Sequence, residues 1–299
     1  MGMFKWAKED SNGSPLFAGA LAGSAVGAKP LADYVSDNYL IPSISNIDQA
    51  VIDATGTLNI DQVKALKENL LDKSIRDKLL VLPSNEGAAL NFVGKRYLPE
   101  RAELEKYLRK GGLQTYEGLA DPVKAVQAMR EAGGFIDLPG REANAIALAH
   151  ELGHATSLNP GRSLRSSRPY RLLDMMGRKL VNSGSRGALA SALLAGSISS
   201  DDNSKWLVPG GIALTQIPLL AEEATASSKA INALKSLKDL PSKTMGVVGE
   251  SNKLFAPAIL ENAGKSLRRA WGTYGLGAAG LLAAPVLAIK AREQWDNRA

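Results

Sequence analysis

The pattern of hydrophobic and polar residues along this chain predicts mostly helices, with a few short strands between them. Amphipathic periodicity favours helices over residues 64–76, 99–110 and 122–132. Two short apolar runs, at residues 78–83 and 88–93, favour strands instead. We expect these two strands to join a third strand in a small sheet.

The third strand and a buried helix are predicted close together near the middle of the chain. Residues 135–138 form a short apolar run between two glycines on one side and Pro139-Gly140 on the other, which is typical of a strand. Residues 143–158 are rich in alanine and leucine and contain no proline, so they favour a buried helix. Asn159-Pro160-Gly161 would end that helix.

Two longer uncharged runs lie near the ends of the sequence. Residues 11–28 and 270–289 have lengths at which a transmembrane helix becomes feasible. In the first, Gly19, Gly23 and Gly27 recur every four residues, a spacing that lets helices approach closely in a bilayer. Both runs are only weakly hydrophobic because of their alanine and glycine content. The pattern therefore leaves two interpretations open, membrane helices or tightly packed helices of a soluble protein.

The chemistry of the chain is concentrated in His150-Glu151-Leu152-Gly153-His154, which uses the only two histidines of the sequence. On a helix, residues four apart share one face, so both imidazoles can reach one metal ion while Glu151 faces the same space. Two histidines and a third ligand would hold zinc with one position left for water. Glu151 would take the proton of that water and deliver it to a leaving amine. The motif therefore predicts a zinc hydrolase.

The third zinc ligand must be a carboxylate, because no further histidine and no cysteine exist. Glu223 lies on the apolar stripe of a predicted helix over residues 219–234, where an unpaired carboxylate would be costly. Asp174, twenty residues after His154, is the alternative ligand. Glu222 falls on the more polar side of the same helix, and we expect it to be a solvated charge.

The motif helix together with Glu223-Ala224-Thr225-Ala226-Ser227 resembles the gluzincin metallopeptidases. The nearest group is the bacterial YugP-type membrane-bound neutral zinc metallopeptidases, and HtpX-like proteases are more distant relatives. The resemblance covers about residues 133–240 and implies that Glu223 is the third zinc ligand, supported by Ser227. In zincins an edge strand before the motif helix holds the substrate backbone, and residues 135–138 are the candidate for it.

Two further uncharged runs, residues 187–200 and 206–221, lie between the two motifs and would form a hairpin into or across the bilayer. Such a hairpin returns both motifs to the same side of the membrane. Arg178, Lys179 and Arg186 flank its entry and its tip is acidic, so the positive-inside rule predicts a cytoplasmic active site. The alternative is a buried helical hairpin that covers the active-site cleft of a soluble cytoplasmic protein.

Composition narrows the class of protein. The chain has 299 residues, 45% of them hydrophobic, so it can bury a substantial core but is not densely polytopic. A net charge of +6 suits an anionic membrane surface. Nucleic-acid binding is not expected, because the basic residues are dispersed and only 5% of residues are aromatic. The absence of cysteine excludes disulfides and thiolate metal sites.

Together these features predict an α+β zincin core of the gluzincin type, with a small sheet, in a largely helical chain that includes membrane-associated helices. We expect a mostly helical N-terminal region over residues 1–130, the peptidase core over residues 131–240, and a linker with an apolar helix over residues 241–299. The expected protein is a membrane-associated zinc endopeptidase acting on peptides or proteins. Its oligomeric state is not fixed by the sequence.

Two questions about the chemistry stay open at the level of sequence. Tyr170, Arg171 and Tyr274 are the candidates for stabilising the oxyanion, since no histidine is left for that role. A structural or membrane-remodelling protein, whose zinc site only stabilises the fold, is the alternative function. Retention of Glu151 argues against that alternative, because a structural zinc site has no use for a base.

Overall fold

The structure is a computed structural model of the whole chain. It describes residues 27–55, 58, 60–77, 79–84, 89–92, 134–139, 144–156, 168–198, 204–238 and 257–296. The predicted helices over residues 99–110 and 122–132 and the predicted linker over residues 241–255 lie outside the described residues, as does all but the end of the apolar run 11–28.

The chain forms two compact units, each assembled from separate segments. Unit 1 comprises residues 1–40, 166–221 and 272–299, and unit 2 comprises residues 41–165 and 222–271. Two of the four boundaries fall inside long helices, α11 (Leu207–Lys238) and α13 (Pro257–Asp296). Each of these helices therefore contributes one part of its length to each unit.

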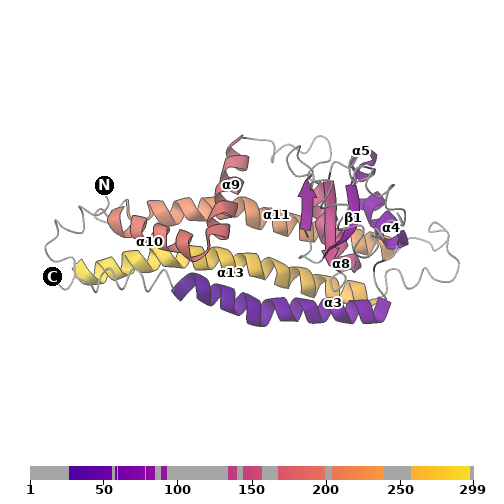
Figure 1. The fold of residues 1–299 in the computed structure, drawn as a ribbon, viewed down its shortest axis with the longest axis horizontal. Coiled ribbons are helices and arrows are strands. Elements are labelled where there is room, and N and C mark those ends of the chain that lie inside the picture. Colours follow the sequence, from indigo (N-terminus) through magenta and orange to yellow (C-terminus); the bar gives the residue numbers. More distant parts are fainter. Residues whose placement is uncertain are drawn as a thin grey trace, which may run out of the picture. The chain divides into compact units, whose positions relative to one another are not determined.

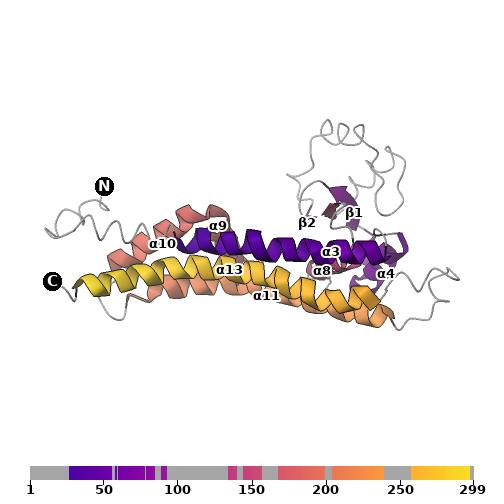
Figure 2. The same ribbon diagram turned by 90° about the horizontal axis from the view of Figure 1, so that it is seen from below.

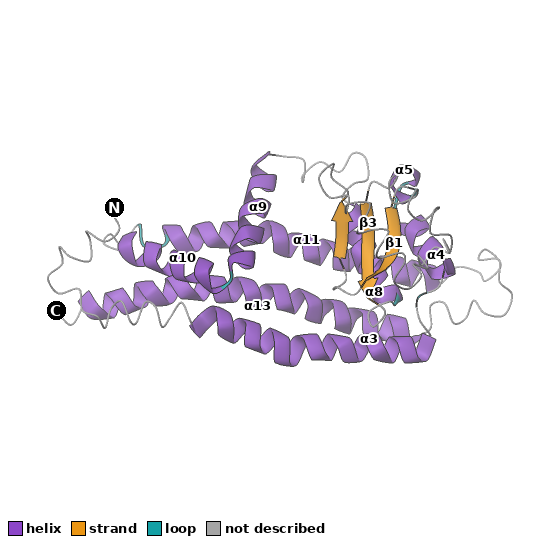
Figure 3. Ribbon diagram, viewed as in Figure 1, coloured by secondary structure: helices purple, strands orange, loops and turns teal. Residues whose placement is uncertain are grey.

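Unit 2 contains a sheet of three short strands (Figure 3). Strand β3 (Gly134–Pro139) lies in the middle, parallel to β1 (Leu79–Ser84) and antiparallel to β2 (Ala89–Phe92). The register pairs Val81 with Ile136 on one side, and Leu90 with Ile136 on the other. Strand β3 is thus not an edge strand, and the prediction that residues 135–138 hold the substrate backbone is wrong. Both sides of this strand are used by its neighbours in the sheet.

Unit 2 also contains helices. They are α3 (Ile41–Thr55), α4 (Ile60–Leu70), the short α5 (Lys73–Arg76) and α8 (Ala145–Ala155), joined by the adjacent parts of α11 and α13. Helix α8 packs against strands β2 and β3 of the sheet. The single helix predicted over residues 64–76 is broken at Leu71 and Asp72, and Asp72 begins α5 as its N-terminal cap residue. Helix α3 runs beside the first part of α13 in two perpendicular views, and Arg269 donates to the carbonyl oxygen of Ser43 over 3.4 Å (Figures 1 and 2).

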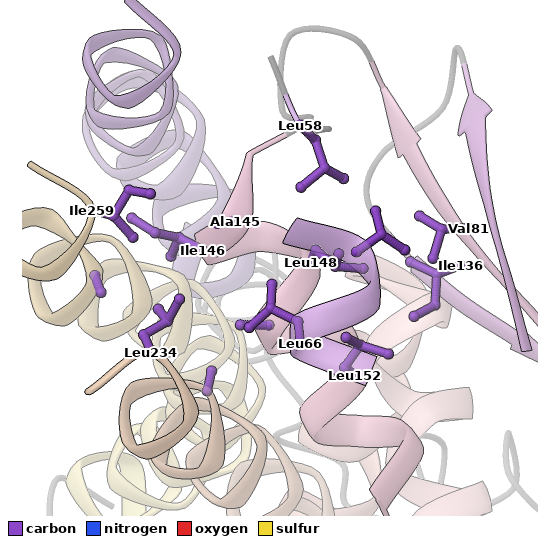
Figure 4. Packing of buried hydrophobic residues seen from close by; sticks show 14 of the residues in the cluster. Leu58, Leu66, Val81, Ile136, Ala145, Ile146, Leu148, Leu152, Leu234 and Ile259 are labelled. Atoms are coloured by element: carbon purple, nitrogen blue, oxygen red, sulfur yellow. The ribbon is translucent and has the colours of Figure 1, made fainter. Parts of the chain in front are cut away.

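The core of unit 2 is built from large aliphatic side chains (Figure 4). Leu148 and Leu152 on α8 are fully buried, and they pack in one cluster with Leu66 of α4, Ile136 of β3 and Leu234 of α11. Burial of one such side chain is worth roughly 1.5–3 kcal/mol. Helix α8 is therefore held from several directions, and its polar residues are fixed in place with it.

The described parts of unit 1 are helices joined by short turns. It contains residues 27–40, which end in a π-helical turn at Ser36–Leu40, together with α9 (Arg168–Ser183), α10 (Ser185–Ile198) and the adjacent parts of α11 and α13. Gly184, with φ of 53°, makes the turn from α9 to α10, a conformation that favours glycine. The buried cluster of this unit is small and made mostly of alanine: Ala188, Ala192, Ile212, Leu281, Ala284 and Ala288.

The α+β class predicted from the sequence is wrong, because the described part of the chain is mostly helical. The three strands have six, four and six residues, whereas α11 and α13 alone have 32 and 40 residues. The apolar runs 187–200, 206–221 and 270–289 lie largely or wholly within α10, α11 and α13. Nearly all of residues 206–221 belong to the helix that also carries Glu223. This helix is therefore longer than the one predicted over residues 219–234.

One described helix is long and apolar enough to cross a membrane by its length and composition. It is the stretch Ile259–Gln294 of α13, and 39% of its most apolar window is buried within the protein. Within this stretch, residues 270–289 carry no charge. Arg268 and Arg269 precede these twenty residues, and Lys290 follows them. Length and composition of this kind are shared by membrane helices and by buried helices of soluble proteins.

Asn144 starts the helix that carries both histidines. Its side-chain oxygen accepts hydrogen bonds from the backbone N–H groups of Ile146 and Ala147, at 2.9 and 3.0 Å. Asn144→Ala should lower the free energy of unfolding by about 1 kcal/mol, because two N–H donors of the first helical turn lose their acceptor. Asn144→Asp, which keeps the acceptor, is the matched control. Equal denaturation midpoints for Asn144→Ala and the unchanged protein would contradict this role of the cap.

Candidate metal centre

Helices α8 and α11 supply all the side chains of the candidate metal centre, which lies within unit 2. His150 and His154 are one turn apart on α8, and their rings are 4.8 Å apart between centroids, close to perpendicular. Both rings direct their Nε2 atoms toward the same place, with 3.3 Å between the two nitrogens. The helical spacing read from the sequence therefore brings the two imidazoles together.

Glu223 on α11 completes a triangle of ligand atoms with the two histidines. Its Oε2 atom is 3.2 Å from Nε2 of His150 and 3.4 Å from Nε2 of His154. Glu223 is 4% exposed, so its carboxylate is removed from water and faces the histidines instead. A buried carboxylate in this position needs a compensating charge, which either a protonated imidazole or a metal ion supplies.

The size of this triangle fits a tetrahedral zinc site. Zinc binds imidazole nitrogen and carboxylate oxygen at about 2.0–2.1 Å, so two ligands at tetrahedral corners are about 3.3 Å apart. The three measured separations, 3.2, 3.3 and 3.4 Å, scatter around that value. Three protein atoms thus have the spacing of three corners of such a site, and a zinc ion bound there would have its fourth corner open to water or substrate. The donor set of two imidazoles and one carboxylate is also one that zinc accepts.

Glu151 lies beside this triangle on α8. It is 7% exposed. One oxygen of its carboxylate and one ring nitrogen each of His150 and His154 all lie within 4.8 Å of one another. That spread is wider than the triangle that the two histidines form with Glu223. The Glu151 carboxylate therefore lies next to the two imidazoles without being part of that triangle.

The outward-facing Nδ1 atoms of both histidines also have partners. Glu222 Oε1 is 3.4 Å from Nδ1 of His154, and Ser227 Oγ is 3.4 Å from Nδ1 of His150. With Nε2 facing the metal centre, each Nδ1–H can donate to its oxygen partner, which fixes the tautomer and orientation of the ring. The contact of Ser227 agrees with the supporting role that the resemblance implied for it.

Glu222 is a residue of the candidate centre that the sequence interpretation missed. We expected a solvated charge, but its side chain is 15% exposed and faces His154. The helical-wheel argument placed it on the polar side of α11, although α8 packs across that side as well. The signal in the sequence that could have identified Glu222 is its position directly before Glu223. From that position its carboxylate reaches His154 of α8.

A close approach of two helices sets the distance between the ligands. A Cβ atom added at Gly153, the glycine between the two histidines, would lie 2.5 Å from the carbonyl oxygen and 2.9 Å from the Cα of Ala226. Only glycine on α8 and a small residue on α11 permit this approach. Thr156 follows α8, donates to the carbonyl oxygen of Gly153 over 2.7 Å, and accepts a hydrogen bond from Lys229 of α11.

The charges in the centre reinforce one another. Burial acts to lower the pKa of His154, but hydrogen bonds to Glu222 and Glu223 outweigh it, and the pKa rises to about 9. The negative charges of Glu223 and Glu151 act in the same direction. Burial acts to raise the pKa of Glu223, but its hydrogen bonds to both histidines dominate and lower the pKa to about 2. Near neutral pH the metal-free centre therefore combines a cationic His154 with an anionic Glu223.

The other residues considered from the sequence lie elsewhere in the fold. Asp174 on α9 belongs to unit 1 and forms an ion pair with Arg178, at 3.1 Å. Tyr170 and Tyr274 also belong to unit 1, and the Tyr170 hydroxyl donates to the carbonyl oxygen of Pro218 over 3.2 Å. The side chain of Arg171 lies outside the described residues. Only Glu223 among the candidate third ligands is joined to the histidines.

Comparison of the chain with protein-family models, with curated proteins and with solved structures gave no match. The assignment of this centre therefore rests on its residues and on their geometry.

Gly153→Ala should disturb the centre without removing any ligand. The added methyl group meets backbone atoms of α11, so the two helices must separate, at a cost of about 1–3 kcal/mol in unfolding free energy. Zinc binding should weaken by roughly tenfold or more, because the triangle widens. Calorimetric titration with zinc and chemical denaturation measure the two effects.

Gly264→Ala on α13 is the matched control for this substitution. The nearest atom to an added Cβ there is Arg268 Nη2 at 3.7 Å, an ordinary contact. This variant should bind zinc normally and be slightly more stable, because alanine favours a helix over glycine by about 1 kcal/mol. If both variants bound zinc equally well, the close approach at Gly153 would not control the ligand spacing.

The pKa shifts also predict how zinc binding depends on protons. The pKa of His154 is 6.5 in the unfolded chain and about 9 in the metal-free fold. Protonation of His154 therefore stabilises the metal-free fold fully below pH 6.5, and this stabilisation is lost as the pH rises through about 9. Near neutral pH zinc must displace the proton of His154, so binding should release about one proton per ion. Calorimetry in two buffers with different ionisation enthalpies measures this number. Binding without proton release would contradict the cationic state of His154.

Proposed function

We propose that this protein is a zinc-dependent endopeptidase of the gluzincin type, with His150, His154 and Glu223 as the metal ligands. The observation that carries the proposal is the triangle of ligand atoms at 3.2–3.4 Å, with a buried glutamate beside it. A zinc site that served only the fold would have four protein ligands. Here three protein ligands leave room for a fourth, and the chain supplies a base next to it.

The side chains around the centre have distinct tasks in this proposal. When bound, zinc supplies a Lewis acid that lowers the pKa of water at the open position toward neutrality. Glu151 accepts the proton of the attacking water on its carboxylate and then delivers it to the leaving amine. Glu222 and Ser227 hold the two imidazole rings by their Nδ1 atoms, so that both Nε2 atoms stay directed at the centre.

The substrate in this proposal is a peptide or a protein segment in an extended conformation. A substrate backbone can be held by adding to a strand at the edge of a sheet. Among the described strands, the edges belong to β1 and β2, since β3 is paired on both sides. Specificity would then come from the loops and strands at those edges and not from residues 135–138, as the sequence had suggested.

We also propose that the protein is membrane-associated, with the metal centre on the cytoplasmic side. The apolar stretch of α13 supports association with a membrane. The orientation is supported by the positive residues Arg178, Lys179 and Arg186, which lie before the apolar runs of α10 and α11 in the sequence. Positive residues beside apolar segments favour the cytoplasmic side.

Glu151→Gln tests the proposed chemistry. The amide keeps the size of the side chain but cannot accept a proton, so peptide hydrolysis should fall by at least about a hundredfold, while zinc content and stability are retained. Hydrolysis of a fluorogenic peptide library and metal analysis of the purified protein measure the two quantities.

Glu223→Gln is the companion variant, and it should lose zinc as well as activity, because a neutral amide is a poor zinc ligand. Full hydrolysis by Glu151→Gln would show that Glu151 is not the base. An unchanged protein that binds one zinc ion but cleaves no peptide would instead favour a structural role for the metal.

A further inference from the structure

The two units bury different kinds of side chain. In unit 2 the buried cluster consists largely of leucine, isoleucine and valine, whereas in unit 1 it consists mostly of alanine. Gly280 of α13 also contributes to unit 1, because a Cβ there would lie 2.9 Å from the Cβ of Ala32. Small residues inside a helical unit allow close packing but leave the large apolar side chains to face outward.

The exposed large apolar side chains of the described residues confirm this difference. Nearly all of them belong to unit 1, and only Ile41 and Trp271, at its boundaries, belong to unit 2. Scattered apolar side chains on a surface need no explanation, but their concentration on one unit of a chain points to a partner.

Helix α9 combines three of these side chains with positive charge. Leu172, Met175 and Met176 are 53%, 47% and 44% exposed. The sequence of α9 contains four basic residues and one acidic residue, Asp174, which is paired with Arg178. Lys179 is exposed on the same helix, one turn after Met175. An exposed apolar face beside a basic one is typical of helices that lie at the surface of an anionic membrane.

The opposite face of α9 packs against α11 within unit 1. A Cβ at Gly177 would lie 2.2 Å from the carbonyl oxygen of Thr215, so α9 packs directly on the backbone of α11. In Figure 1, α9 runs across the direction of α10 and of the neighbouring part of α11. Leu214 and Ile217, on either side of Thr215 in α11, are 55% and 56% exposed. Helix α9 is therefore fixed to the unit by its small residue, while its large apolar residues remain outside.

We propose that the outer face of α9, formed by Leu172, Met175, Met176 and Lys179, binds the surface of an anionic lipid bilayer. The three apolar side chains enter the boundary between headgroups and acyl chains, and the exposed Arg178 and Lys179 contact the phosphates. Lipid is favoured over a protein or nucleic-acid partner because one narrow face offers flexible apolar side chains and positive charge together. This proposal concerns unit 1 only, and it holds whether or not the metal centre is catalytic.

The test uses the full-length chain, in which the absence of cysteine makes any introduced cysteine a unique label site. Met175→Cys, labelled with an environment-sensitive nitrobenzoxadiazole fluorophore, is titrated with vesicles of equal parts phosphatidylcholine and phosphatidylglycerol, and with vesicles of phosphatidylcholine alone. We expect a blue shift and a rise in emission with the anionic vesicles and a much weaker response with the neutral ones. Glu68→Cys, at an exposed position of α4 in unit 2, is the matched control and should not respond.

A second variant separates the charge from the apolar contact. Arg178→Gln combined with Lys179→Gln, in the labelled Met175→Cys background, should weaken binding to anionic vesicles roughly thirty-fold, because two basic residues near the surface are lost. Circular dichroism and zinc binding should remain unchanged, which shows that the chain is still folded.

Several results would overturn the proposal. One is a label at position 175 that does not respond to anionic vesicles, and another is an equal response to neutral vesicles. A response that appears without lipid and grows with protein concentration would assign the face to a second copy of the chain. A response to RNA in place of vesicles would assign it to nucleic acid.

Discussion

The candidate metal centre depends on the contact between the backbones of α8 and α11 at Gly153 and Ala226. One of these helices carries both histidines and the other carries Glu223, so the distance between the helices decides whether the three ligand atoms can meet. With side chains of ordinary size at the crossing, the helices would be farther apart and the triangle would widen. The apolar cluster around Leu148, Leu152 and Leu234 then keeps the two helices pressed together.

This crossing also explains why the residues next to the ligands matter. Glu222 precedes the ligand Glu223, and Ser227 follows it by one turn, so both lie on the part of α11 that faces α8. Each reaches the outward nitrogen of a different histidine. Three carboxylates, Glu151, Glu222 and Glu223, thus lie around two imidazoles. That excess of negative charge favours either a protonated histidine or a cation at the centre, and a divalent ion satisfies it more completely than one proton does.

The sequence predicted which side chains of this centre lie together better than it predicted the fold. Histidines four residues apart on a helix share a face whatever surrounds them, so the pairing of His150 with His154 follows from helical geometry alone. The ligand Glu223 could be selected because a carboxylate on an apolar stripe is unusual. The fold class and the middle position of β3 could not be deduced, because they depend on how distant segments pair. Glu222 was missed for the same reason, since its burial comes from α8 and not from its own helix.

Helix α11 links the two kinds of packing found in this protein. Its first part, through Ala221, belongs to the unit with an alanine-rich interior and exposed leucines, and its second part begins with Glu222 and Glu223. At 1.5 Å of rise per residue, the first metal-centre residue follows the last residue of unit 1 by a single step along one continuous helix. Because Glu222 and Glu223 begin the part of the helix that belongs to unit 2, their contacts are made with the histidines of α8 and not with the alanine-rich interior around the residues before them.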